Sequence, residues 1–296
     1  MDYMHKAGFV NIVGNPNVGK STLMNQLVGE KLSIATFKAQ TTRHRIMGIV
    51  NTEDTQIVFS DTPGVLKPNY KMQEMMLQFS ESALADADIL LYVTDVVEDP
   101  EKNMDFLEKV SKMSIPVILL INKIDESDQK TLGNLVTKWH GLLPNAEILP
   151  ISAKNKFGVD ILLKRVHELL PESPAFFDKD QLTDKPAKFF VSEIIREKIL
   201  RYYDKEIPYS VEVVIERFKE DDRQIHISAI IYVERSSQKG IIIGHQGMAL
   251  KKVSTEARKS LERFFDKKIF LETFVKVDKD WRNSQKELKH FGYSPE

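Results

Sequence analysis

The sequence predicts two domains: an α/β domain with a mostly parallel sheet covered by helices on both faces, then a smaller α+β domain. The chain has 296 residues, and a globular domain commonly holds about 100 to 200. Short apolar runs alternate with helical patterns in its first part, which favours a parallel sheet. Residues 171–186 hold three prolines and no apolar periodicity, as a linker would.

The expected elements follow this division. The strand candidates of the first part are Phe9–Val13, Ile46–Val50, Gln56–Ser60, Ile89–Asp95, Val117–Ile121 and Ile148–Ile151. Its helix candidates are Lys20–Val28, Met72–Ala85, Met104–Met113, Leu132–Leu143 and Val159–Leu170.

The second part has a different order, α-β-β-α-β-α, with room for a short extra turn beside a glycine loop. Its candidates are a helix Phe190–Tyr203, strands Val211–Phe218 and Gln224–Glu234, a basic helix to about Asp266, a strand Ile269–Val277 and a helix from about Trp281. We therefore expect a first domain over 1–172, a linker over 173–187 and a second domain over 188–296.

Composition excludes several classes of protein. The chain has no cysteine, which excludes disulfides, thiolate metal sites and cysteine catalysis. Apolar runs such as Pro116–Ile121 are far shorter than the roughly 18 residues that a membrane span needs. The first ten residues also lack the pattern of a secretory signal.

The formal net charge of −1 conceals two unlike halves. The residues before Asp184 carry 19 basic and 24 acidic side chains, a net of −5. The residues from Asp184 onward carry 23 basic and 19 acidic side chains, a net of +4. The near-neutral total is therefore no argument against a nucleic-acid partner.

The segment Gly14–Ser21, GNPNVGKS, matches the pattern GxxxxGK[ST] between a predicted strand and a predicted helix. The amides of such a loop and the helix N-terminus attract phosphate. Lys20 would bridge the β- and γ-phosphates, and the Ser21 hydroxyl would bind Mg²⁺. Because this motif serves both ATP and GTP, the base must be selected elsewhere.

Three further motifs end predicted strands: Asp61–Gly64 (DTPG), Asn122–Asp125 (NKID) and Ser152–Lys154 (SAK). Open α/β sheets bind ligands at this edge. Asp61 can hold Mg²⁺ through water.

The second and third motifs favour guanine. The Asp125 carboxylate can accept hydrogen bonds from guanine N1–H and N2–H₂, Asn122 can meet N7, the Lys123 stem can cover the purine and the Ala153 amide can donate to O6. A carboxylate left unpaired by adenine would cost several kcal/mol, so GTP should be strongly preferred. The expected nucleotide contacts are Gly14, Asn15, Pro16, Asn17, Val18, Gly19, Lys20, Ser21, Thr22, Asp61, Thr62, Pro63, Gly64, Asn122, Lys123, Asp125, Ser152, Ala153 and Lys154.

A GXXG loop, Gly244–Gly247, lies between the apolar run Ile241–Ile243 and the basic helix. Such loops clamp the backbone of nucleic acids in KH domains, and flanking cations strengthen the attraction. The expected RNA contacts are Lys239, Ile242, Ile243, Gly244, His245, Gln246, Gly247, Lys251 and Lys252. The two central residues of the loop are uncharged where many KH loops carry lysine or arginine, and some of the isoleucines are expected to belong to the core.

Together these motifs resemble the Era family of bacterial GTPases, which carry a C-terminal KH type II domain. The resemblance rests on GNPNVGKST, KAQTTRHRIMGIV, DTPG, NKID and SAK, then on FFVSEIIREKILRYYDKEIPYSVEV, VERSSQKGIIIGHQGMALKKV and the terminal FGYSPE. It covers almost the whole chain.

The resemblance implies roles for the switch residues. Thr42 would close on Mg²⁺ and the γ-phosphate, with Thr41 as an open alternative, and the Gly64 amide would sense the γ-phosphate. The implied metal ligands are Ser21, Thr42 and Asp61, and the implied catalytic residues are Lys20, Thr42, Gly64 and Asn17.

Two residues bear on the rate of hydrolysis. Val65 stands where Ras-like GTPases carry a glutamine that orients water, so we expect slow intrinsic hydrolysis. Asn17 matches an asparagine that helps some relatives hold K⁺ beside the phosphates. A purely structural role for Asn17 stays open.

The resemblance further implies binding of the 3′ end of small-subunit ribosomal RNA and a role in maturation of the 30S subunit. It implies a monomer in the cytoplasm, with peripheral contact to the inner membrane as an expectation of the family only. Two alternatives stay open: a switch whose KH-like domain docks protein or membrane surface, and an ATPase.

Overall fold

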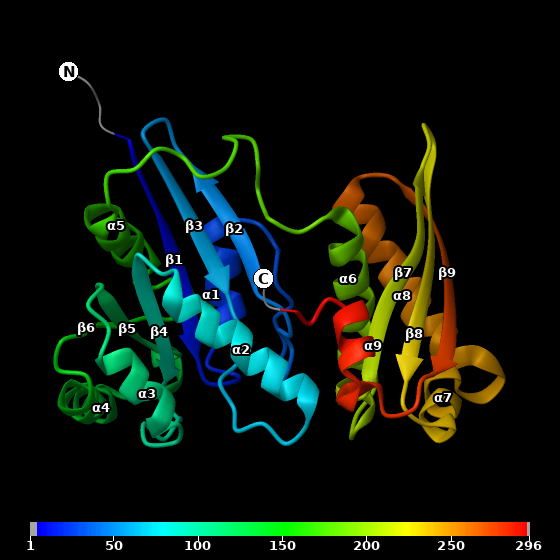
Figure 1. Ribbon diagram of the computed structural model, residues 1–296, viewed down its shortest axis with the longest axis horizontal. Helices are drawn as coiled ribbons and strands as arrows, with labels where there is room; N and C mark the ends of the chain where they lie inside the picture. Colours follow the sequence, from blue (N-terminus) through cyan, green and yellow to red (C-terminus); the bar gives the residue numbers. More distant parts are fainter. Residues whose placement is uncertain (1–4, 295–296) are drawn as a thin grey trace. The chain divides into compact units, whose positions relative to one another are not determined.

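The computed structural model describes residues 5–294, and the chain forms two compact units (Figure 1). The first holds the described residues up to Asn69 and Gln73–Asp184, and the second holds Tyr70–Met72 and Lys185–Ser294.

The first unit is built on a six-stranded sheet with the order β2-β3-β1-β4-β5-β6. Strand β2 pairs with β3 in antiparallel fashion, and the other neighbours are parallel, which confirms the predicted mostly parallel sheet. The strands are β1 Lys6–Gly14, β2 Ile46–Asn51, β3 Thr55–Asp61, β4 Ile89–Asp95, β5 Val117–Asn122 and β6 Glu147–Pro150. The helices are α1 Lys20–Val28, α2 Lys71–Ala85, α3 Met104–Ser111, α4 Gln129–Leu142 and α5 Val159–Leu169, with a 3₁₀ turn η1 at Ile124–Glu126.

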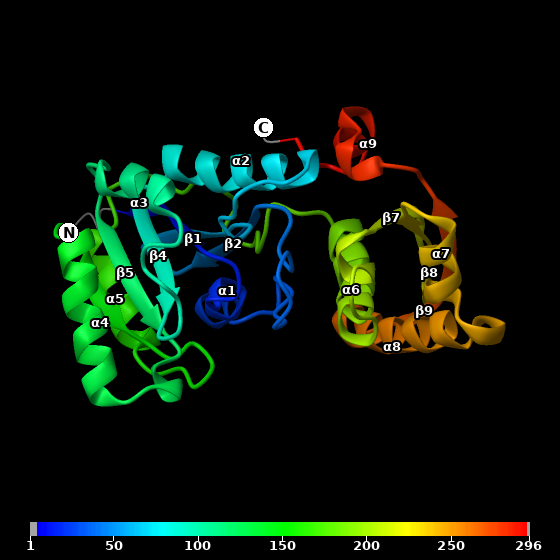
Figure 2. The same ribbon diagram turned by 90° about the horizontal axis from the view of Figure 1, so that it is seen from below.

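Helices cover both faces of this sheet. Helix α1 lies on one side, and α2 and α3 lie on the other (Figure 2). Every residue of the central strand β4 is buried, because a parallel strand with helices on both faces has no side exposed to water. Strands β1, β3, β4, β5 and β6 run parallel, so the residues that follow them meet at one edge of the sheet.

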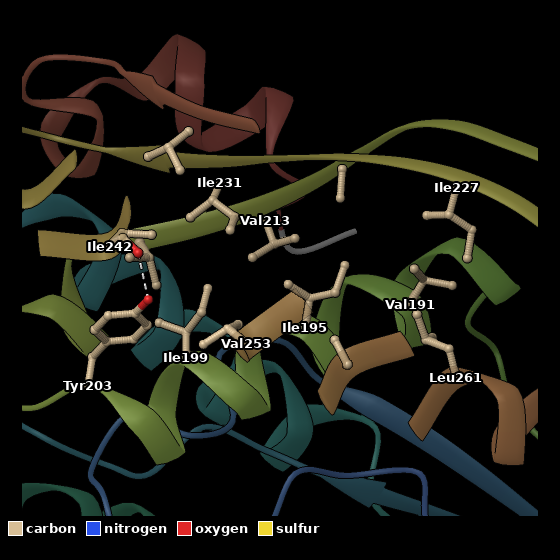
Figure 3. Packing of buried hydrophobic residues seen from close by; sticks show 14 of the residues in the cluster. Val191, Ile195, Ile199, Tyr203, Val213, Ile227, Ile231, Ile242, Val253 and Leu261 are labelled. Atoms are coloured by element: carbon tan, nitrogen blue, oxygen red, sulfur yellow. Dashed lines mark hydrogen bonds between the residues drawn. The ribbon is translucent and has the colours of Figure 1, made fainter. Parts of the chain in front are cut away.

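The second unit has a three-stranded sheet in the order β7-β8-β9, in which β7 and β8 are antiparallel and β8 and β9 are parallel. Its elements are α6 Ala187–Tyr202, η2 Ile207–Tyr209, β7 Val211–Glu220, β8 Gln224–Val233, α7 Ser236–Ile243, η3 His245–Gly247, α8 Met248–Phe265, β9 Lys268–Val277, η4 Trp281–Asn283 and α9 Gln285–His290. Isoleucine and valine side chains from α6, α7, α8 and one face of the sheet form its core (Figure 3).

The apolar run Ile241–Ile243 is the end of an eight-residue helix, α7, where we expected a short turn. The Gln238 side chain explains the start of this helix, because its Oε1 accepts hydrogen bonds from the backbone N–H groups of Glu234 and Arg235, both at 3.0 Å. Three consecutive isoleucines favour a strand locally, and burial of the middle one in the core outweighs that preference.

Much of the expected linker packs on the first unit. The Phe176 ring lies 4.8 Å from the ring of Phe9, and the carbonyl of Leu182 accepts a hydrogen bond from the Ile49 amide at 2.8 Å. Thr183 Oγ1 donates to the Met47 carbonyl at 2.7 Å. Residues 182–184 therefore cover the edge strand β2, whose backbone groups would otherwise be open to pairing with another chain.

Gln56 fixes this segment from inside the sheet. Its Oε1 accepts hydrogen bonds from the amides of Phe176 and Phe177 at 2.7 and 3.0 Å, and its Nε2 donates to the Phe177 carbonyl at 2.8 Å. Because Gln56 is fully buried, its loss would leave backbone groups without partners.

We expect Gln56→Ala to lower the free energy of unfolding by about 2 to 3 kcal/mol, because each buried group left unpaired costs about 1 to 3 kcal/mol. Urea denaturation followed by tryptophan fluorescence measures this loss. The segment 173–184 should also become the preferred site of limited proteolysis. Gln129→Ala, at an exposed helix position, is the control and should change neither result; equal stability of the two variants would contradict the role of Gln56.

Candidate nucleotide site and nucleic-acid interface

The phosphate loop turns between β1 and α1 at two positions that only glycine fits. Gly14 has φ +145°, and a Cβ there would lie 2.1 Å from the carbonyl oxygen of Val93. Gly19 has φ +97°, and a Cβ there would lie 2.3 Å from Nδ2 of Asn122. The loop therefore packs directly on β4 and on the side chain that ends β5.

Lys20 begins helix α1 and is buried over the loop. Its Nζ donates hydrogen bonds to the carbonyls of Gly14 at 3.0 Å and Asn15 at 2.7 Å. Burial lowers the pKa of Lys20 to about 8, and the negative charges of Asp61 and Glu98 oppose that shift. A bound phosphate would supply the counter-charge that this cation lacks.

Three oxygen-bearing side chains converge beside Lys20. Ser21 Oγ donates to Asp61 Oδ2 at 2.8 Å and lies 2.8 Å from Thr42 Oγ1, and Thr42 Oγ1 lies 3.3 Å from the same carboxylate oxygen. Thr41 turns away, because its hydroxyl donates to the Lys38 carbonyl at 2.5 Å. Of the two switch threonines, Thr42 is therefore the one that reaches this cluster.

The Asp61 carboxylate fits a divalent cation. Its side chain is fully buried, and Oδ1 has no hydrogen-bond partner within residues 5–294. Burial raises the pKa of Asp61, opposed by the Lys20 charge and by the hydroxyls of Ser21, Ser33 and Thr42. A hard oxygen set with one unsatisfied carboxylate oxygen suits Mg²⁺.

The DTPG motif lies against the phosphate loop. A Cβ at Gly64 would stand 2.6 Å from Cα of Pro16, so the chain passes too closely for any side chain. The Val65 amide donates to the Gly14 carbonyl at 3.0 Å, while the Val65 side chain packs in the core beside Phe106 and Leu107. Position 65 therefore places no polar group at the phosphates. A pocket of about 180 Å³, which Asn17, Lys20, Ser21, Thr42 and Gly64 help to line, opens here.

Asn122 joins the phosphate loop to the base-binding motifs. Its Nδ2 donates to the Val18 carbonyl at 2.8 Å, and its Oδ1 accepts from the Ala153 amide at 2.9 Å. The Ala153 N–H, which we expected to face guanine O6, is thus directed at Asn122 here. The amide nitrogen of Asn122 carries a second N–H, which is available for guanine N7.

Lys123 and Asp125 are held by partners of their own. Lys123 has φ +62°, and its Nζ forms an ion pair with Asp95 Oδ2 at 2.5 Å. Asp125 Oδ1 accepts a hydrogen bond from Ser152 Oγ at 2.6 Å, which holds the pKa of Asp125 below its usual range. Asp125 is exposed and therefore offers an ionised carboxylate to a ligand at neutral pH.

Asn103, just before α3, was missed from the sequence. Its Nδ2 donates to Asn15 Oδ1 and, at 3.1 Å, to the Val65 carbonyl, so it links the phosphate loop to the residue after DTPG. An asparagine among charged residues carries no motif, and only its position between two loops gives it this role. Asp95, the partner of Lys123, was missed for the same reason.

In the second unit, the GXXG loop has the backbone that its glycines allow. Gly244 and Gly247 have φ +71° and +74°, and Gln246 has φ +49°. A Cβ at Gly244 would lie 2.6 Å from Cβ of Ala249. Helix α8 begins directly after the loop without a side-chain cap, and the two central residues of the loop, His245 and Gln246, are exposed.

One expected RNA contact is wrong. Ile242 is fully buried in the core, and its carbonyl accepts a hydrogen bond from the Tyr203 hydroxyl at 2.7 Å (Figure 3). It anchors the start of the loop from inside and offers no surface to a ligand. Ile243 also packs at the edge of the core.

The expected cations lie on the helices beside the loop. Lys251 and Lys252 are exposed on the first turn of α8, and Lys239 is half-buried on α7. The Lys252 ammonium lies 4.6 Å from the centre of the Tyr202 ring, which limits its reach. No helix within residues 5–294 combines the length and the apolar character that crossing a bilayer requires.

Comparison with known proteins matches both units. Residues 9–123 match the family described as 50S ribosome-binding GTPase, and residues 206–282 match the KH domain family. GTPase Era of Clostridium kluyveri is 44% identical over 292 residues, which cover 98% of this chain and 100% of the relative. GTPase Era of Geobacter sp. strain M21 is 46% identical over 290 residues, covering 97% and 98%.

Solved structures agree over the same length. A crystal structure of Era in complex with MgGDPNP and nucleotides 1506–1542 of 16S ribosomal RNA is 37% identical, covers 98% of this chain and 100% of its own, and has a TM-score of 0.94. A variant of Aquifex aeolicus Era bound to GDP·AlF₄⁻ has a TM-score of 0.93 at 37% identity, with the same coverage. A phosphate loop, a guanine-reading edge and a KH domain in one chain, together with this similarity along its length, establish that the chain belongs to the Era family of GTPases.

Proposed function

We propose that this GTPase binds the 3′ end of small-subunit ribosomal RNA through its second unit and assists maturation of the 30S subunit, with the nucleotide state controlling RNA binding. The relative with MgGDPNP and 16S ribosomal RNA supports both ligands. The observation that carries the switch is the convergence of Ser21, Thr42 and Asp61 beside Lys20, since one of these residues lies on a loop that a γ-phosphate can hold or release.

The proposed site residues have separate roles in hydrolysis. Ser21 and Thr42 would hold Mg²⁺ through their hydroxyls, with Asp61 acting through water, and the metal would neutralise charge on the β- and γ-phosphates. Lys20 and the loop amides would hold the phosphates in place, and the Gly64 amide would face the γ-phosphate. Water then attacks the γ-phosphorus in line with the leaving oxygen. Because Val65 is packed in the core, no side chain there orients that water, and turnover should be slow.

We expect Asp125→Asn to weaken GTP binding by at least about 100-fold, because hydrogen bonds to a charged group contribute about 1.5 to 3 kcal/mol each and two are lost. XTP binding should strengthen, since an amide can donate to the carbonyl that xanthine carries at C2. Calorimetric titration with both nucleotides measures the change. Asp128→Asn is the matched control, because Asp128 caps helix α4 and asparagine caps as well. Unchanged preference for GTP in Asp125→Asn would refute the guanine-reading role.

We also propose that K⁺ assists hydrolysis beside Asn17. Asn17 is exposed at the pocket and has φ +67°, so Asn17→Gly removes the side chain without straining the backbone. GTP turnover should be severalfold faster in KCl than in NaCl for the wild-type chain and equal in both salts for Asn17→Gly. Equal turnover of the wild-type chain at matched ionic strength would leave Asn17 a structural residue.

The GXXG loop can be tested by introducing negative charge at its two exposed central positions. We expect His245→Asp with Gln246→Asp to weaken binding of the 16S 3′ end at least tenfold, because carboxylates would face phosphate. The salt slope of binding should fall by about one for each phosphate that the protein no longer neutralises. His245→Lys with Gln246→Lys should tighten binding instead. Fluorescence anisotropy with a labelled oligonucleotide measures both. If neither the aspartate pair nor the lysine pair changes RNA affinity, the loop does not hold RNA.

A further inference from the structure

The sheet of the second unit has a face that the core does not use. Along β9, Ile269 and Val275 point into the core, so Phe270, Glu272 and Phe274 point to the other side, because side chains of a strand alternate. Helix α8 and helix α9 lie on opposite sides of the strands (Figure 2). The outer face is therefore on the opposite side of the sheet from α8, the helix that follows the GXXG loop.

Two aromatic rings stand open on this face. Phe270 is 50% exposed and Phe274 is 49% exposed, an unusual state for phenylalanine in a strand that borders a packed core. The two side chains are four residues apart and thus separated by about 13 Å. His226, the partner of Phe270 in the β8–β9 register, places its ring 5.6 Å from that of Phe270.

Cations border the rings. On β7, a bulge between Ile215 and Arg217 shifts the register, so that Arg217 pairs with Ser228 and Lys219 pairs with His226 on the outer face. Lys268 begins β9 on the same side. None of these three cations forms an ion pair with any residue in the range 5–294.

Some carboxylates near the rings have cationic partners of their own and so do not offset the charge of Arg217, Lys219 and Lys268. Glu216 lies 3.5 Å from Lys276 and Glu220 lies 2.8 Å from Lys267, whereas Asp221 lies 3.5 Å from His226, which is a cation only when protonated. Glu272 alone stands between the two phenylalanines. The open region thus keeps an excess of positive charge beside its aromatic rings.

The C-terminal segment defines where this face ends. The rings of Tyr232 and Phe291 lie 5.2 Å apart, and the Tyr293 hydroxyl donates to Glu212 Oε2 at 2.6 Å. That end of the sheet is covered, while the end around Phe270 is open. We call the open region the sheet platform; it consists of Arg217, Lys219, His226, Lys268, Phe270 and Phe274.

We propose that the sheet platform is a second RNA-binding surface, which holds a single strand by stacking bases on Phe270 and Phe274 and by contacts from Arg217, Lys219 and Lys268 to phosphates. Exposed aromatic residues on a sheet are a recurrent platform for unpaired bases, and phosphate contacts position the strand. A protein partner would require one continuous apolar patch with few charges at its centre. Two separated rings bordered by unpaired cations therefore favour a nucleic acid. This surface goes beyond the proposed function of the GXXG loop and is distinct from it.

Paired substitutions in the full chain separate stacking from simple apolar contact. Phe270→Leu with Phe274→Leu keeps apolar bulk and removes both rings, whereas Phe270→Trp with Phe274→Trp keeps aromatic faces. We expect the leucine pair to weaken binding of a labelled single-stranded 16S 3′-end RNA at least about tenfold and the tryptophan pair to retain wild-type affinity. Unchanged circular dichroism and thermal unfolding establish that the variants are folded. Equal affinity of the leucine pair and the wild-type chain overturns the proposal.

A second measurement locates the strand. RNA carrying 4-thiouridine should cross-link to residues 268–277 as well as to the GXXG loop, and Arg217→Gln with Lys219→Gln should lower the salt slope of binding by about two. Cross-links confined to the loop overturn the platform and leave the proposed function intact. An absence of RNA binding by the wild-type chain overturns both. A leucine pair that alters self-association in sedimentation, with RNA affinity unchanged, also overturns the platform.

Discussion

The buried carboxylate of Asp61 is the constraint on which the first unit depends. A charged group without contact to water is costly unless cations and hydrogen-bond donors surround it. Lys20 and Ser21 at the start of α1 and Thr42 on the loop before β2 supply that environment. One oxygen still lacks a partner within the described residues. The position of Thr42 is thereby tied to what binds at this carboxylate, as the proposed switch requires.

Asn122 extends that dependence to the base. Its amide holds the phosphate loop at Val18 and the SAK loop at Ala153, and Gly19 must lack a side chain for it to fit. A change in either loop therefore moves the other. The phosphate loop and the proposed guanine-reading loops are therefore joined through one side chain.

The sequence was sufficient to predict that the four motifs gather at one edge of the sheet, because each follows an apolar strand and parallel strands bring their carboxyl ends together. It was insufficient where a residue acts through contacts between distant segments. Asn103 and Gln56 carry no motif, yet Asn103 joins two loops and Gln56 joins the segment 173–184 to strand β3. Ile242 shows the opposite failure, because its place beside a glycine loop indicated a surface role while the packing of α7 buries it. Thr42 and Thr41 could be separated only by the direction in which each hydroxyl points.

The charge distribution has a consequence for how the second unit can hold RNA. A net charge of +4 spread over more than one hundred residues provides only modest sequence-independent attraction, and the loop itself has no cation at its two central positions. Affinity must then come from contacts with bases, and two linked surfaces bind one strand far more tightly than either alone, because the second contact is intramolecular. An exposed aromatic platform on the outer face of the sheet would supply such a contact without raising the charge. The proposed stacking surface would therefore supply the RNA affinity that a GXXG loop without cations at its centre lacks.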